Sequence, residues 1–224
     1  SFELSVMALV VAYFAPFTLP VRDATAVELI AYYVLINIGV ACLTSVKAWK
    51  ILNQIAFLIT AIVGGIYALI HGYTAEKSQI SVLVWAHAAI FIWLGFRSSQ
   101  LSIQLDTADR PRKNLLDLAL IFATPLTAYG FLYLIHFNER IWQATFSLIF
   151  AVIFALCWQW TRRSQRLNML AQSYLSLMLI FIAFIPPILL EGEWSVIGWA
   201  VEGLLIYVWA LEKHLKVAHY LAMA

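Results

Sequence analysis

Eight long apolar runs account for most of this 224-residue chain. Each has about the 17 to 25 residues that an α-helix needs to cross a hydrocarbon core of roughly 30 Å. The runs are continuous, whereas the strands of a membrane barrel alternate apolar and polar residues over segments of about ten. We therefore expect an all-α, polytopic transmembrane helix bundle of eight helices, at 4–19, 28–46, 53–71, 79–96, 114–135, 142–160, 168–190 and 194–211.

The composition agrees with this class, since 63% of the residues are hydrophobic and only 12% are charged. A soluble domain carries about twice as many charges. The connections between the runs are short except for the polar stretch 98–114, so residues 1–224 fit one transmembrane block without a separate soluble domain. The first residue is Ser1, which favours a piece of a longer polypeptide. A net charge of +2 gives no reason to expect a nucleic-acid partner.

Lysine and arginine are distributed unequally between alternate connections. Eleven of the 14 follow the second, fourth, sixth and eighth runs, and three follow the other runs. The positive-inside rule then places both ends of the chain and the stretch 98–114 in the cytoplasm. The turn that carries Glu191 and Glu193 is predicted to be an outer acidic turn. It could bind a cation or an amine headgroup, although solvated loop charges are the simpler interpretation.

One carboxylate, Glu202, lies inside the last apolar run. A charge at that depth costs at least about 2.5 kcal/mol on insertion scales, so it requires a protein partner, a water-filled cavity or a bound proton. His87 and Asn37 also lie inside their runs. At a rise of 1.5 Å per residue, all three are about eight or nine residues, or roughly 12 Å, below the outer ends of their helices.

Two interpretations of this polar level remain open. In the first, Asn37, His87 and Glu202 form one intramembrane site in which the two titratable groups relay a proton or bind a polar group of a substrate. In the second, each side chain makes its own interhelical hydrogen bond, with Glu202 protonated. Either way, we expect Glu202 to face the bundle interior and to pair with His87 or Asn37.

The remaining polar features predict no cofactor. Cys42 and Cys157 fall inside apolar runs, where a thiol usually behaves as a small buried hydrophobe, so we expect neither a disulfide nor a metal site. Prolines at 16, 125, 186 and 187 are expected to interrupt or bend their helices, because each removes a backbone donor.

The segment from Ile185 to Trp209 reads IPPILLEGEWSVIGWAVEGLLIYVW. It resembles a recurrent motif of a large bacterial family of multi-pass membrane proteins, catalogued as domain of unknown function 2339. The matching positions are Pro186, Gly192, Trp194, Trp199, Ala200, Glu202, Gly203 and Trp209, while Val201 and Tyr207 depart from the usual pattern. Weaker matches are TPLTAYG at 124–130 and AYFAP at 12–16. The resemblance implies a bacterial membrane protein with further helices, and it implies no particular activity.

Three classes of function are consistent with these features. We favour a non-enzymatic module of the bacterial inner membrane that assembles with the cell envelope or handles its lipids or glycans. The alternatives are a secondary transporter with a polar site near Asn37, His87 and Glu202, and a multi-pass envelope glycosyl- or acyltransferase. No catalytic motif favours an enzyme. The expected partners are the lipid bilayer and the remaining helices of a longer chain or partner membrane subunits.

Overall fold

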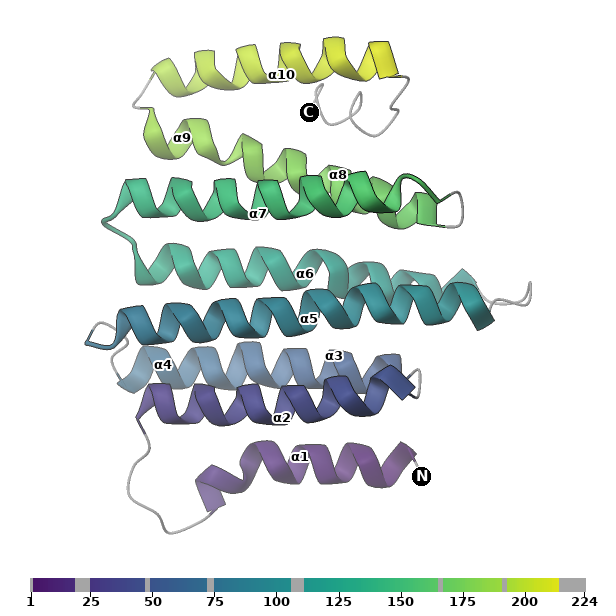
Figure 1. Ribbon diagram of the computed structural model, residues 1–224. Coiled ribbons are helices and arrows are strands. Elements are labelled where there is room, and N and C mark those ends of the chain that lie inside the picture. Colours follow the sequence, from purple (N-terminus) through teal and green to yellow (C-terminus); the bar gives the residue numbers. More distant parts are fainter. Residues whose placement is uncertain are drawn as a thin grey trace. The chain divides into compact units, whose positions relative to one another are not determined.

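The computed structural model describes residues 2–18, 25–46, 49–71, 75–105, 111–164, 167–190 and 193–213. Every regular element among them is helical, as predicted (Figure 1). The chain divides into two compact units, Ser1–Ile135 and His136–Ala224. Each unit is described by itself below, and the expectation of one transmembrane block stays a prediction.

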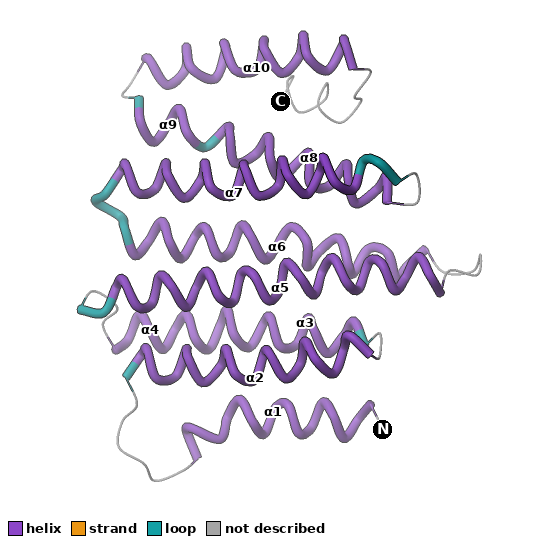
Figure 2. Tube along the Cα trace, in the orientation of Figure 1, coloured by secondary structure: helices purple, strands orange, loops and turns teal. Residues whose placement is uncertain are grey.

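The first unit contains five helical rods. They are α1 (Phe2–Thr18), α2 (Ala26–Val46), the continuous rod made of α3 (Lys50–Ile59), the π-helix η1 (Thr60–Gly64) and α4 (Gly65–His71), then α5 (Lys77–Leu105) and α6 (Pro111–Ile135). Figure 2 shows that the rod through η1 is helical along its whole length. These rods correspond to the first five predicted helices.

The second unit contains the other three rods. They are α7 (Arg140–Thr161), α8 (Asn168–Ala183) with α9 (Ile185–Leu189), and α10 (Glu193–Lys213). Only Phe184 separates α8 from α9. Figure 2 shows a short loop segment between the two helices. The prediction of eight helices is therefore confirmed over the described residues.

Within the described part of the chain, five helical segments are long and apolar enough to cross a membrane, judged by length and composition. They are Ala26–Ser45, Lys50–His71, Lys77–Leu101, Arg140–Thr161 and Asn168–Leu189. Two shorter apolar helices, Phe2–Thr18 and Leu120–Ile135, accompany them. The eighth expected span is α10, whose side chains beyond Tyr207 lie outside the described set.

The prediction of a long connection at 98–114 is wrong, because most of this stretch is helical. Helix α5 continues to Leu105 and α6 begins at Pro111, so only residues 106–110 fall outside the described helices. Hydropathy marks where a helix leaves the hydrocarbon rather than where its hydrogen bonds end, and residues 98–105 contain no proline or glycine. Pro111 suits the first position of a helix, because the amide that it lacks has no intrahelical partner there.

Aromatic donors occupy the carbonyls that two of the prolines leave free. Pro16 cannot donate to the carbonyl of Ala12, and the hydroxyl of Tyr32 donates to that oxygen at 2.9 Å. Pro187 likewise cannot donate to the carbonyl of Ala183, and the indole Nε1 of Trp199 donates to it at 2.8 Å. These two backbone oxygens are therefore satisfied, which a helix in lipid requires.

The junction between α9 and α10 explains part of the tryptophan-rich motif. A Cβ atom added at Gly198 would lie 2.9 Å from Cδ1 of Leu190 and 3.0 Å from Cβ of Pro186. The proline ring cannot move away easily, so glycine permits this close approach. Pro186, Gly198 and Trp199 therefore act together to hold α10 against the end of the preceding rod.

Replacing Trp199 with Phe should lower the free energy of unfolding by about 1 kcal/mol, since interhelical hydrogen bonds in membranes contribute about 0.6 and at most about 1.7 kcal/mol. Reversible unfolding in bicelles would measure the change. Trp194→Phe is the matched control, because Trp194 is 68% exposed on the same helix. Equal stability of the two variants would contradict the role given to the Trp199 bond.

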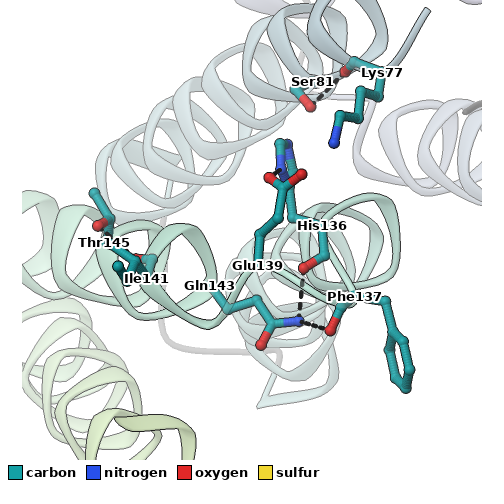
Figure 3. Close-up of polar contacts among 8 residues, drawn as sticks. All are labelled: Lys77, Ser81, His136, Phe137, Glu139, Ile141, Gln143 and Thr145. Carbon is teal, nitrogen blue, oxygen red and sulfur yellow. Dashed lines mark hydrogen bonds and ion pairs between the residues drawn. The ribbon is translucent and has the colours of Figure 1, made fainter. Parts of the chain in front are cut away.

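A polar turn begins the second unit (Figure 3). The carboxylate of Glu139 lies 2.6 Å from Nδ1 of His136, and Nε2 of Gln143 donates to the carbonyls of His136 and Phe137 at 2.9 and 3.0 Å. The figure shows the amide of Gln143 directed at both carbonyl oxygens. This side chain therefore ties the start of α7 to the turn that precedes it.

Candidate functional site

A buried polar cluster joins three rods of the first unit. The hydroxyl of Tyr13 on α1 donates to Oδ1 of Asn37 on α2, and Nδ2 of Asn37 donates to Oγ1 of Thr60 at 2.9 Å. The hydroxyls of Tyr13 and Thr60 lie 3.1 Å apart. Both Tyr13 and Asn37 are fully buried. The cluster therefore closes into a triangle of hydrogen bonds, which is the kind of interhelical contact that holds membrane helices together.

Thr60 is also the first residue of the π-helix. A π-turn carries one more residue per turn than an α-helix and is often found at functional sites. The two glycines at its end, Gly64 and Gly65, let aromatic rings approach the backbone. A Cβ atom at Gly65 would lie 2.7 Å from Cζ of Phe131 on α6, so this ring needs glycine at position 65. The π-turn therefore connects the polar cluster, at Thr60, with the ring of Phe131, at Gly65.

A cavity adjoins this turn, and its lining includes both Thr60 and Phe131. It is bounded by α2, the α3–η1–α4 rod, α5 and α6, and its empty volume, including the open mouth, is about 780 Å³. Its lining runs from Ile80 to Phe91 on α5 and from Thr124 to Ile135 on α6. The eleven residue-to-residue steps in each of these stretches correspond to roughly 16 Å, about half the hydrocarbon thickness.

The lining is mostly apolar and contains no charged Asp, Glu, Lys or Arg side chain. It consists of Ile30, Tyr33, Phe57, Thr60, Ala61, Gly64, Gly65, Ala68, Leu69, Ile80, Val84, His87, Ala88, Phe91, Thr124, Thr127, Ala128, Phe131, Leu134 and Ile135. Leu69 and Leu134 are 56% and 45% exposed, so the cavity reaches the surface of the unit near one end of α4 and α6.

Two buried polar atoms among the lining residues have no hydrogen-bond partner in the described part of the chain. They are Nε2 of His87 on α5 and Oγ1 of Thr124 on α6. Leaving a buried polar atom unsatisfied costs about 1 to 3 kcal/mol. Atoms of this kind call for a partner, such as a ligand or an ordered water.

The three residues of the predicted polar level have different environments. Asn37 has both ends of its amide bonded inside the first unit, whereas His87 lines the cavity. Glu202 belongs to α10 of the second unit, and both of its carboxyl oxygens are buried without a hydrogen-bond partner among the described residues. The pairing of Glu202 with His87 or Asn37 stays a prediction.

Sequence reasoning missed Tyr13, Thr60 and Thr124. Each is a hydroxyl-bearing residue inside an apolar run, which is the same signal that singled out Asn37. Serine and threonine are common in membrane helices, because their hydroxyls can bond the carbonyls of their own helix. Thr44, for example, donates to the carbonyl of Val40 at 2.8 Å. Only the packing distinguishes the hydroxyls that face another helix or a cavity.

The outer acidic turn is described only in part. Glu193 is exposed in the first turn of α10, where a carboxylate interacts favourably with the helix dipole, and Glu191 lies outside the described residues. Within the described ranges, no group of three or more His, Cys, Asp or Glu residues is arranged to hold a metal ion. The cavity of the first unit is therefore the strongest candidate for a functional site.

Comparison with known families agrees with the motif. The model of a family described as Predicted membrane protein (DUF2339) matches residues 2–223. The chain belongs to this family. Neither a curated protein nor a solved structure matches it. In this DUF2339 chain, the motif residues Pro186 and Trp199 build the α9–α10 junction, whereas the cavity is formed by the first unit.

Proposed function

We propose that this DUF2339 chain is a non-enzymatic, lipid-handling module of the bacterial cell envelope, with the cavity of the first unit as the place where it takes up a hydrocarbon chain. The cavity carries the proposal. It is long, uncharged and open at the apolar surface of the unit. Protein interiors are normally packed as densely as organic crystals, so a space of this kind surrounded by lipid fills with hydrocarbon.

The lining also limits what can enter. A phosphate or carboxylate headgroup inside the cavity would lack a cationic partner, because the lining contains no Lys or Arg. The mouth near Leu69 and Leu134 is apolar, so a chain can pass from the bilayer without crossing water. The proposed occupant is therefore a single hydrocarbon chain that brings no charged group with it.

Photolabelling in membranes tests this proposal. The chain, embedded in phosphatidylcholine vesicles, would be irradiated with a hexadecyl probe that carries a diazirine. We expect saturable labelling at cavity residues such as Phe131 and Val84, which an excess of an unlabelled single-chain lipid removes. Labelling at Leu35, which is 68% exposed on α2, serves as the control and should not saturate. Unsaturable labelling of equal strength at both places would contradict the proposal.

A transporter is the second candidate. It is favoured by two titratable side chains, His87 and Glu202, that each bury a polar atom without a hydrogen-bond partner among the described residues. A transporter that uses a titrating proton would lose transport in Glu202→Gln while the variant still assembles, since the amide keeps a donor and an acceptor. The lipid-handling module predicts instead that Glu202→Gln leaves saturable photolabelling unchanged.

The proposed location is the bacterial inner membrane, with both ends of the chain in the cytoplasm. It is supported by the eleven-to-three distribution of Lys and Arg. Single cysteines at positions 102 and 193, in a background without Cys42 and Cys157, would be treated with an impermeant thiol reagent in intact cells. We expect labelling at position 193 and none at position 102. The opposite pattern would reverse the orientation.

A further inference from the structure

His87 has one ring nitrogen whose role is fixed by its partner. Its Nδ1 lies 2.9 Å from the backbone carbonyl oxygen of Leu83, four residues earlier on α5. A carbonyl oxygen only accepts, so Nδ1 must carry the hydrogen. In the neutral imidazole the other nitrogen, Nε2, then carries a lone pair and acts as an acceptor. The hydrogen bond to Leu83 therefore assigns the tautomer.

His87 belongs to the cavity wall, and its acceptor nitrogen is buried. His87 is only 8% exposed, and its Nε2 has no partner among the described residues. The cavity lining contains no carboxylate that would stabilise the charged imidazolium. Thr124 contributes a second unpartnered group, but its hydroxyl both donates and accepts, so it does not select between ligands. The lone pair on Nε2 of His87 is therefore the feature that selects a ligand with a hydrogen-bond donor.

We infer that the lipid taken up by this cavity is a long-chain alcohol whose hydroxyl group donates a hydrogen bond to Nε2 of His87. This inference rests on the proposed function and names its ligand class. A hydroxyl supplies the donor that Nε2 lacks, whereas an ether, ester or ketone oxygen would place one acceptor against another. Phosphates and carboxylates are disfavoured because the lining offers no cation. A single chain with a small neutral head suits the length and the uncharged lining.

Nε2 of His87 is buried rather than exposed to the cavity. The imidazole or the side chains beside it must therefore shift slightly as the hydroxyl arrives, as interface side chains commonly do on binding. Val84 and Ala88 of the same helix also line the cavity. The hydroxyl then leaves water for a site where it makes a hydrogen bond rather than remaining unpaired.

The test compares an alcohol with its methyl ether, in which a methyl group replaces the hydroxyl hydrogen. The detergent-purified chain would be titrated with oleyl alcohol and with oleyl methyl ether, and bound ligand would be counted by native mass spectrometry. We expect the alcohol to bind more tightly by a factor of about 3 to 10, the size of one net hydrogen bond. His87→Leu should remove this preference. His71→Leu is the control and should keep it, because His71 is exposed and bonds its own helix at Tyr67.

The outcomes separate the two proposals. Equal affinity for alcohol and ether in the unmodified chain would overturn the hydroxyl assignment while leaving the lipid-binding cavity in place, and this comparison needs no variant. A preference that persists in His87→Leu would also overturn it. Failure of both ligands to bind would contradict the proposed function itself.

Discussion

Replacing Asn37 with Leu is expected to lower the stability of the first unit by about 1 to 3 kcal/mol, the sum of two interhelical hydrogen bonds at membrane values and the misfit of a branched side chain in a closed space. Asn37 is fully buried and bonds Tyr13 on one side and Thr60 on the other. Without it, α1 loses its side-chain attachment to Asn37 and keeps the bonds that Tyr32 and Tyr33 of α2 donate to its backbone. We therefore expect α1 to loosen before the other rods of this unit.

Hydrogen exchange at the α1 amides and unfolding in bicelles would measure both effects. Thr44→Val is the matched control, because Thr44 is also buried on α2 but donates to Val40 of its own helix. Its removal should cost less than about 0.5 kcal/mol and leave α1 protected. If Asn37→Leu behaved like Thr44→Val, the polar triangle would have no role in holding α1.

Replacing Ala88 with Phe is expected to abolish saturable photolabelling of the cavity. Ala88 is 2% exposed and lines the cavity between Val84 and Phe91, so the added ring would occupy the space of a bound chain. The effect on labelling should exceed tenfold, because a side chain attached to the wall competes at a very high effective concentration.

Two further variants provide a control and an independent test of this prediction. Ala89→Phe adds the same ring to the adjacent position, which is exposed and does not line the cavity, and it should leave labelling unchanged. Leu69→Trp blocks the exposed mouth without inserting a ring into a closed core, and it should reduce labelling even if Ala88→Phe folds poorly. Retained labelling in both Ala88→Phe and Leu69→Trp would place the bound chain elsewhere.

The helices of this chain could be predicted from hydropathy alone, because every membrane-spanning backbone must satisfy its own hydrogen bonds. Their ends could not, as α5 shows by continuing to Leu105 beyond its apolar run. Hydropathy measures the solvent that a residue prefers, whereas a helix ends where its backbone bonding ends. The break at Phe184 could be predicted, because Pro186 and Pro187 lack the backbone amides that would continue the hydrogen bonding of the helix.

The candidate site was predictable only as a level in the membrane. Asn37 and His87 could be assigned a similar depth by counting residues, yet one is bonded to Tyr13 and Thr60 and the other lines a cavity. Rotation about each helix axis decides which environment a residue meets, and these helices are apolar on all sides, so no amphipathic pattern indicates that rotation. The cavity itself arises from small residues such as Gly64, Ala68 and Ala128, which the sequence also uses for close packing.

Native mass spectrometry of the chain extracted from its own membrane tests the central claim most directly. The account predicts one retained single-chain lipid per polypeptide, released only on gas-phase activation and absent from Ala88→Phe. A distribution of bound lipids that is the same in the wild type, Ala88→Phe and Ala89→Phe would contradict the existence of a lipid-binding cavity in this protein.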